Sequence, residues 1–140
     1  MVSLVAFRVG RMRCGLPVAQ ITEIVPSAPA TRVPGAVPVV NGLVNVRGRL
    51  LTVADGRRIL NQADAEPVEE PAILVLEVGG RPLGLVVDEV YDLLHVPEEA
   101  MEERGALPGV DPRIVRAVAR VADDVVVVLE ADVIFAPVFA

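Results

Sequence analysis

Short runs of β-forming residues recur along the chain, and glycine or proline separates one run from the next. Residues 4–9 and 72–78 are two such runs, and each leads into a glycine-bearing turn, Gly10-Arg11 and Gly79-Gly80. Apolar β-rich runs joined by turns of this kind are typical of β-hairpins. The pattern therefore predicts a protein built mainly of strands.

The two hairpin regions also resemble each other. When the chain is laid over itself at an offset of 69 residues, apolar positions and glycines coincide. Past residue 24 the register slips by several residues, after which residues 51–53 resemble residues 126–128. Self-similarity of this length indicates that one supersecondary unit is used twice. The coincident pairs include Leu4 with Ile73, Gly10 with Gly79, Gly15 with Gly84, and Ile24 with Leu93.

We interpret the repeat as two pseudo-equivalent β-barrels within a single domain of residues 1–140, at about residues 2–60 and 71–135. Residues 61–71 between them are polar and acidic, as expected of an exposed connection. A unit of about 65 residues has a marginal core by itself, so the two units are expected to share an apolar interface. Aromatic residues make up only 3% of the chain, so Val, Leu, Ile and Ala must fill that interface.

Helical signals are few and short. Residues 18–24, 36–43 and 97–104 are the best candidates, and the third opens with proline and acidic residues, as a first helical turn prefers. Asp123-Asp124 lies between two apolar runs and is predicted to form a hairpin turn.

Charge and composition exclude several classes of function. The net charge is −6, which disfavours a nucleic acid partner because phosphate binding relies on clustered positive charge. No apolar run approaches the roughly 20 residues of a membrane helix, and the first residues lack the features of a secretion signal. We therefore expect a cytoplasmic protein. Cys14 is the only cysteine, which rules out an internal disulfide and a thiolate metal site.

Candidate catalytic groups are sparse. Asp55, Asp88 and Asp92 interrupt apolar stretches and are the carboxylates available for acid–base chemistry. Carboxylates at strand ends are more often solvated or bonded to backbone amides. His95 is the only histidine, Cys14 fits a core position, and no glycine cluster has the spacing of a phosphate-binding loop. No cofactor is expected, although a small enzymatic or ligand-binding barrel that uses the three aspartates stays open.

The segment of residues 41–50 is unusual because an arginine and a glycine interrupt an otherwise apolar strand, and we expect no counterpart in the other barrel. In one interpretation Gly48 supplies a bulge or tight bend and Arg47 covers apolar surface with its stem. In the other, Arg47 projects from a rigid strand and offers a planar guanidinium to a partner's carboxylate.

At these residues the sequence resembles the CheW-like family, and the likeness runs along nearly the whole chain. Two segments are fairly specific when they occur together, the Asn-x-Arg-Gly of residues 45–48 and the Gly-x-x-Val-Asp-x-Val of residues 84–90. The remaining pieces follow in family order: Gly15-Leu16-Pro17, Ile21-Thr22-Glu23-Ile24, Arg32-Val33-Pro34, Asp55-Gly56-Arg57 and the closing strand at residues 125–129.

The resemblance implies an all-β fold of two five-stranded SH3-like barrels on a shared hydrophobic core, with a few short helices. It also implies a non-catalytic adaptor that binds the cytoplasmic tip of a chemoreceptor and the regulatory domain of a CheA-type histidine kinase. Such an adaptor is recruited to membrane-associated receptor arrays in chemotaxis or chemosensory-like signalling. By position, Glu23 matches the acidic residue of receptor contact, and Gly42 and Arg47 match residues of receptor and kinase coupling. Asp88 matches an acidic residue for which we expect a largely structural role.

Two departures from the family pattern bear on function. Gly56 stands where the family usually has leucine, and glycine costs about 1 kcal/mol in a helix, so we expect a loosened segment there. Arg116 replaces a usual glycine. A divergent member that binds a receptor but not the kinase is therefore an alternative. Another is a regulatory domain detached from a kinase or receiver-containing protein.

Overall fold

The computed structural model describes residues 1–38, 40–103 and 107–139. Most of them belong to strands, as the β-rich runs predict. The strands are β1 (Val2–Val9), β2 (Met12–Pro17), β3 (Ile21–Pro26), β4 (Val40–Val46), β5 (Arg49–Asp55), β6 (Ala72–Val78), β7 (Arg81–Val87), β8 (Glu89–Val96), β9 (Met101–Glu103), β10 (Val115–Val121) and β11 (Asp124–Leu129). Single helical turns lie between some of them, η1 (Val18–Gln20), α1 (Gly56–Ile59), η2 (Glu98–Ala100) and η3 (Pro112–Ile114), and two more follow β11, α2 (Ala131–Ile134) and α3 (Ala136–Phe139).

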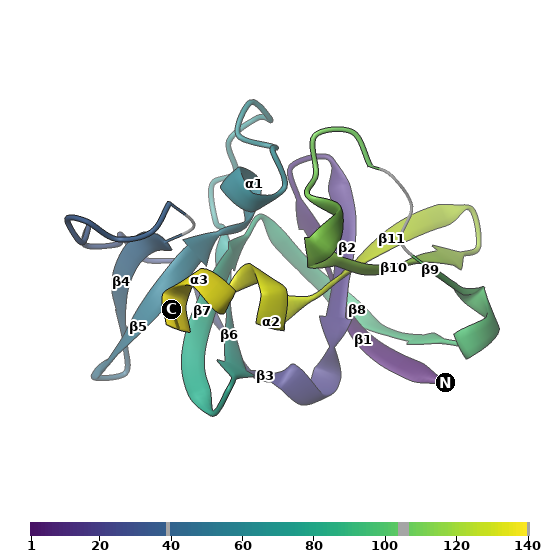
Figure 1. The fold of residues 1–140 in the computed structure, drawn as a ribbon, viewed down its shortest axis with the longest axis horizontal. Coiled ribbons are helices and arrows are strands. Elements are labelled where there is room, and N and C mark those ends of the chain that lie inside the picture. The colour runs from purple at the N-terminus through teal and green to yellow at the C-terminus, as the bar shows by residue number, and fades with distance from the viewer. Residues whose placement is uncertain (39, 104–106, 140) are drawn as a thin grey trace.

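The strands form two sheets that lie beside each other, with α2 between them and α3 over β5 and β7 in the view of Figure 1. One sheet has six strands in the order β8-β1-β2-β11-β10-β9, and the other has five in the order β3-β6-β7-β5-β4. Neighbouring strands are antiparallel except for β2 with β11 and β5 with β7, which are parallel. Each sheet therefore combines strands from both sides of residues 61–71, and the sheets do not follow the two halves of the sequence.

The two sheets repeat one arrangement of strands. β1, β2 and β3 correspond to β6, β7 and β8 at an offset of 69, and β4, β5 and α1 correspond to β10, β11 and α2 at an offset of 75, since residue 56 matches residue 131. The register is also repeated, because Val127 pairs with Cys14 and the equivalent Thr52 pairs with Leu83. The prediction of an all-β fold with two related SH3-like barrels is confirmed.

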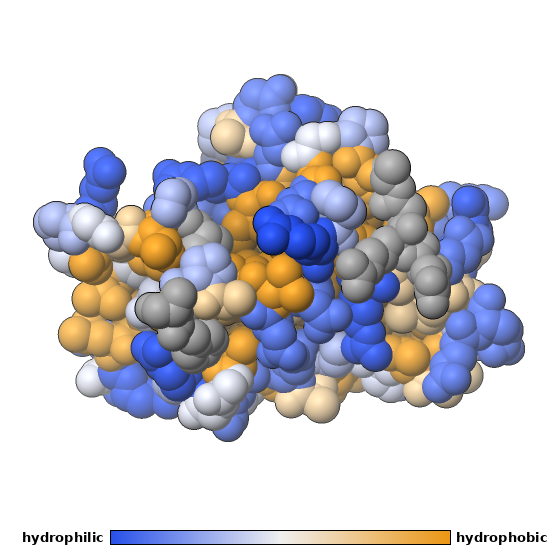
Figure 2. Space-filling view, viewed as in Figure 1, coloured by the Kyte–Doolittle hydropathy of each residue, from blue (hydrophilic) through white to orange (hydrophobic). Residues whose placement is uncertain are grey.

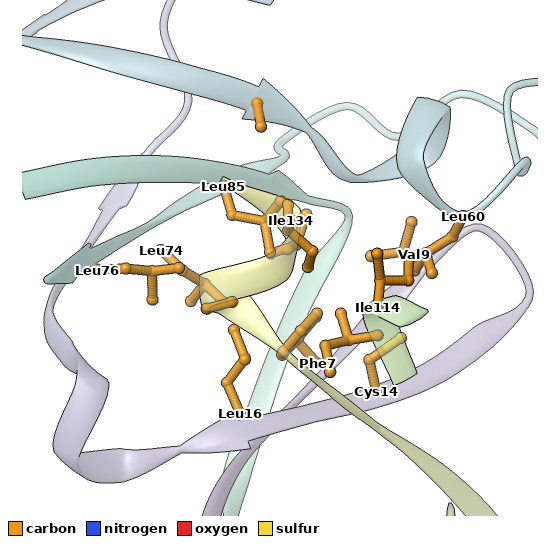
Figure 3. Close-up of a cluster of buried hydrophobic side chains, with 14 of the residues drawn as sticks. Phe7, Val9, Cys14, Leu16, Leu60, Leu74, Leu76, Leu85, Ile114 and Ile134 are labelled. Carbon is orange, nitrogen blue, oxygen red and sulfur yellow. The ribbon is translucent and has the colours of Figure 1, made fainter. Parts of the chain in front are cut away.

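A continuous apolar core joins the two sheets. Phe7 and Leu16 from the six-stranded sheet pack in one cluster with Leu74 and Leu85 from the five-stranded sheet, and Ile134 of α2 closes it (Figure 3). Each of these side chains is at most 4% exposed. Full burial of an aliphatic or aromatic side chain contributes about 1.5–3 kcal/mol, so this shared cluster is the main source of stability between the sheets.

The predicted helices are mostly wrong. Residues 18–24 form one 3₁₀ turn, η1, and then enter β3, where β-branched residues alternate between packed and exposed faces. In residues 36–43, β4 begins at Val40, and Val39 lies outside the described residues. In residues 97–104, η2 is followed by β9, and Arg104 lies outside the described residues. A pattern of only two turns does not distinguish a helix from a turn followed by a strand.

The hairpin turn expected at Asp123-Asp124 lies one residue earlier. Val121 pairs with Asp124, so Ala122 and Asp123 form the turn, and Ala122 has a φ of 55°. At the offset of 75 these turn residues match Arg47 and Gly48. The segment around Arg47 therefore has a counterpart in the other sheet, contrary to our expectation, and the register slip in the sequence conceals it.

Replacement of Leu74 by alanine is expected to lower the free energy of unfolding by about 2–5 kcal/mol, because Leu74 is fully buried where the sheets meet. Leu50→Ala makes the same chemical change at a side chain that is 67% exposed and is expected to stay within about 0.5 kcal/mol of wild type. Urea unfolding of the two variants measures the difference. Equal losses would mean that the shared cluster does not hold the sheets together.

Candidate functional site

The turn between β4 and β5 presents Arg47 at the tip of a hairpin. Arg47 and Gly48 have φ values of 52° and 82°, and Val46 pairs with Arg49 across them. Two consecutive residues with positive φ form the tight turn that suits the twist of a hairpin. The Asn45 side chain fixes this turn, since its Oδ1 accepts a hydrogen bond of 2.8 Å from the Gly48 amide. Arg47 thus projects from a turn and not from a strand, and Gly48 supplies the bend.

Glu23 of β3 lies beside this turn, so the structure brings two of the predicted site residues together. Arg47 Nη1 is 2.9 Å from Glu23 Oε1. The Arg47 side chain is 79% exposed, whereas that of Glu23 is 21% exposed. Glu23 Oε1 accepts no hydrogen bond from the described residues, so the contact is an ion pair without a well-directed hydrogen bond. A pair this exposed contributes about 0–1 kcal/mol to stability, and its main effect is to orient the guanidinium.

Gly42 of β4 is held by the segment that precedes the strand. Thr31 and Leu43 exchange two backbone hydrogen bonds, of 2.8 and 2.9 Å, and this segment crosses directly over Gly42. A Cβ atom on Gly42 would overlap the carbonyl oxygen of Thr31. The glycine is therefore required for close approach of two backbones, and it does not itself present a side chain to a partner.

Asp88 occupies the point where the chain crosses from β7 to β8, and hence from one sheet to the other. Its side chain is 4% exposed. Arg57 Nε donates to both carboxylate oxygens, at 2.9 and 3.1 Å, and the Gly10 amide donates to Oδ2 at 2.5 Å. The Asp88 amide in turn donates to the Arg8 carbonyl, and Arg8 Nη1 lies 3.7 Å from Oδ2. We call Asp88, Arg57, Arg8 and Gly10 the charged node.

Arg57 extends the charged node to the connection between the repeats. Its Nη1 donates to the Ala65 carbonyl at 2.7 Å, and its Nη2 donates to the Glu66 carbonyl. The guanidinium therefore bridges a buried carboxylate and the backbone of the exposed segment. A planar fork with five donors suits this task, which a lysine cannot perform.

Arg57 is positioned by the short helix α1, which is ordered despite Gly56. Asp55 caps this helix, because its Oδ1 accepts from the Arg57 amide at 3.0 Å. A Cβ atom on Gly56 would come within 2.5 Å of the Val86 carbonyl oxygen. Glycine thus lets α1 pack against β7, and our expectation that Gly56 loosens this segment is wrong. Its helix-propensity cost is small beside a backbone overlap.

The remaining candidate residues do not form a catalytic cluster within the described residues. Asp55 and Asp88 are both engaged by Arg57, while Asp92 is exposed on β8. His95 is exposed and pairs with Ser3, whose Oγ is 3.0 Å from Nδ1. Cys14 is buried, and this burial raises the pKa of its thiol to about 12. Arg116 lies exposed at a β-bulge on β10, where the register with β11 shifts.

The surface also carries apolar groups at equivalent places in the two repeats. Ile24 on β3 and Leu93 on β8 are 46% and 53% exposed, and they match at the offset of 69. Leu50 on β5 and Val125 on β11 are 67% and 45% exposed, and they match at the offset of 75. Exposure of a large apolar residue at both copies of a position indicates a surface that the two repeats share.

Between the repeats, an open hollow lies among α1, η3, α2 and α3. Figure 2 shows hydrophobic surface near the middle of this face, over α2. The hollow has a mainly apolar lining with one charged pair, Asp111 and Arg113, at its edge. Its apolar residues are Ile59, Ile114, Val133, Ile134, Ala136 and Pro137.

From the sequence, Gly10 is predicted only as part of a turn, and no role is predicted for Arg8 or Arg57. One signal was present in the repeat: at the offsets above, Asp88 matches Ala19 and Arg57 matches Asp132. Charged residues that the repeat does not preserve mark a place where the two halves differ. The sequence alone does not show that these residues, 31 positions apart, meet in space.

Asp88→Asn is expected to lower the free energy of unfolding by about 3 kcal/mol, because it leaves the Arg57 cation without its buried counter-charge. Asp124→Asn removes the carboxylate that pairs with Arg13 at the surface and is expected to leave the unfolding midpoint near that of wild type. Chemical denaturation of both variants measures the contrast. An Asp88→Asn protein as stable as Asp124→Asn would mean that the charged node contributes no net stability.

Gly42→Ala is expected to displace residues 30–31 from β4, because its methyl group would overlap the Thr31 carbonyl. Faster hydrogen exchange at the Thr31 and Leu43 amides would report the displacement. Gly35→Ala is the control, since no atom lies within 4 Å of the added Cβ and Gly35 is also at positive φ. Unchanged protection at both amides in Gly42→Ala would contradict the assigned packing role.

Comparisons with known proteins agree with this arrangement. The family model described as the CheW-like domain matches residues 3–138. A chemotaxis protein CheW of Rhizobium meliloti is 36% identical over 99 residues, or 71% of this chain and 64% of that protein. A protein PilI of Pseudomonas aeruginosa is 31% identical over 100 residues, or 71% of this chain and 56% of that protein.

The crystal structure of the scaffolding protein TtCheW from Thermoanaerobacter tengcongensis has the same fold, with a TM-score of 0.87 and 22% identity. The superposition covers 96% of this chain and 87% of that one. The helices of the described residues are all too short to cross a lipid bilayer. The family model spans nearly the whole of both repeats, and this chain belongs to the CheW-like domain family.

Proposed function

We propose that this chain is a non-catalytic adaptor that couples a bacterial chemoreceptor to a CheA-type histidine kinase in chemotaxis or a chemosensory-like pathway. Membership of the CheW-like family supports the proposal, as do relatives whose names refer to chemotaxis. The observation that carries it is Arg47, an exposed arginine at a rigid hairpin tip, oriented by Glu23. The adaptor works in the cytoplasm, at receptor arrays.

The receptor contact combines charge with apolar surface. The guanidinium of Arg47 is pre-oriented, so it loses little side-chain freedom when it binds a carboxylate on the receptor tip. Leu50 is exposed on the same hairpin and adds apolar area beside it. Because a helical bundle presents apolar residues at intervals of three and four, the hollow near α2 suits the same partner.

The kinase contact uses exposed apolar residues that occupy equivalent positions in the two repeats. A CheA-type regulatory domain is itself built of related barrels, so its own ends can pack against such positions. Leu93 and Val125 lie exposed on the six-stranded sheet, and Ile24, the equivalent of Leu93, lies exposed on the five-stranded sheet. A few exposed apolar residues inside a polar rim suit a contact of small or standard size.

The alternative of an enzymatic barrel has less support. Its carboxylates have other roles in this structure, since Asp55 caps α1 and Asp88 is neutralised by Arg57. Asp88 acts in the proposed adaptor indirectly, because it fixes the crossing between the sheets. The alternative of a receptor-binding protein without kinase contact depends on Arg116, which is exposed on β10.

Arg47→Ala is expected to weaken receptor and kinase binding by about 5- to 30-fold, as loss of an interface arginine worth 1–2 kcal/mol would do. The thermal melting temperature should stay near that of wild type, since the side chain is 79% exposed. Titration of the purified chain against a receptor signalling fragment and a CheA-type kinase gives both affinities.

Arg11→Ala is the matched control, because Arg11 is 65% exposed and also paired with a carboxylate, that of Asp64. It should bind both partners as wild type does. Wild-type affinities in Arg47→Ala would remove the role assigned to Arg47. A wild-type chain that binds the receptor fragment but not the kinase would establish the narrower alternative.

A further inference from the structure

Neither half of the sequence can complete a sheet by itself. The half before residue 61 supplies β1 and β2 to one sheet and β3, β4 and β5 to the other. The half after residue 71 supplies β8, β9, β10 and β11 to the first of these sheets, and β6 and β7 to the second. Four strand pairings join the halves: β1 with β8, β2 with β11, β3 with β6, and β5 with β7. Each half alone would leave these edges and its share of the core uncovered.

The connection between the halves is fastened almost entirely to the first half. Arg57 holds the carbonyls of Ala65 and Glu66, and the Arg11 amide donates to the Gln62 side chain at 3.0 Å. At the other end, the Ser27 amide donates to the Pro71 carbonyl at 2.9 Å. Residues 67–70 lie between these two anchor points, and Pro67 and Pro71 restrict the backbone at both ends.

The contacts between the halves do not depend on which chain supplies each half. If residues 67–70 extended outward, the second half of one copy would make the same four strand pairings with the first half of another copy. Only the path of this short hinge would differ. The balance between the two forms is therefore set by hinge length and protein concentration, not by the strength of the interface.

We propose that this chain can form an intertwined dimer in which two copies exchange their second halves across residues 67–70. The partner is a second copy of this chain, and the surface is the set of strand edges and core faces that each half offers to the other. At micromolar concentration the closed monomer is favoured, because the tethered half has an effective concentration of the order of millimolar. The dimer forms on refolding at high concentration and then persists, because its separation requires unfolding.

Hinge length tests the proposal directly. Deletion of residues 68–70 reduces the maximum reach between Glu66 and Pro71 from about 18 Å to about 7 Å, and shortening of a hinge loop favours exchange over closure. This variant is expected to refold mainly as a dimer. Insertion of three glycine or serine residues at the same place is the matched control and is expected to refold as a monomer. Size-exclusion chromatography with light scattering gives the mass of each.

A crosslink distinguishes exchange from ordinary association. Ser3 on β1 of the first half and His95 on β8 of the second half are directly paired across the two strands, with Ser3 Oγ 3.0 Å from His95 Nδ1. In the Ser3→Cys/His95→Cys variant, a closed monomer forms the disulfide within one chain, whereas an exchanged dimer forms it between two chains. A denaturing gel without reductant separates these products. Cys14 does not interfere when oxidation follows refolding, because it is then fully buried and burial raises the pKa of its thiol to about 12.

The expected result is a dimer joined by disulfides between chains. It should form in the shortened variant, and also in the protein with the unaltered hinge when this protein is refolded at high concentration. Its fraction should rise severalfold over a tenfold increase in protein concentration. The proposal fails if the crosslinks form only within chains at every concentration, whether the particle is a monomer or a dimer. Should the shortened variant not fold, the concentration series on the unaltered hinge decides by the same criterion.

Discussion

The parallel pairings of β2 with β11 and of β5 with β7 determine the architecture. Each one joins a strand of the first half to a strand of the second, and each places a glycine, Gly15 or Gly84, in the shared register. The missing side chain allows the facing strands to pack at these points, since a Cβ on either glycine would press on side chains at 3.0–3.3 Å. Because both sheets are completed in this way, their inner faces must form one core. The outer surface is then built on a single rigid body.

The charged node makes this nearly symmetric body asymmetric. Asp88 ties the crossing between the sheets to α1, to the first hairpin and to the connection, whereas the equivalent crossing has Ala19 in its place. A buried carboxylate is tolerated here because Arg57 and a backbone amide satisfy it. The two repeats can therefore present similar apolar groups on the surface, although only the crossing from β7 to β8 is fixed by a buried carboxylate. Two copies of one unit thereby acquire distinguishable ends, as the proposed adaptor between two different partners requires.

Much of this fold could be predicted from the sequence, because strand periodicity and a repeat of turns survive divergence. The mixing of strands from both halves in each sheet could not be predicted. A barrel formed within one half and a barrel formed from both halves require the same alternation of apolar residues. One of the two interpretations placed Arg47 on a strand, whereas it lies at positive φ in the turn, a conformation that is unusual for arginine, and Gly48 supplies the bend. The pairing of Glu23 with Arg47 joins β3 to the β4–β5 hairpin from the opposite side of the five-stranded sheet, and no local pattern encodes that contact. Asp88 was expected to be structural, and its contact with the Gly10 amide is of that kind.

The order of the strands along the chain also affects how the protein is made. β2 ends at Pro17, yet its parallel neighbour β11 begins only at Asp124, so ribosomal synthesis must add roughly a hundred residues before that edge can be covered. At about 5–20 residues per second this interval lasts roughly 5–20 seconds. Throughout it the β2 edge of the β1–β2 hairpin has no partner strand, even after β8 covers the other edge. That edge is therefore open to non-native pairing until translation is nearly complete.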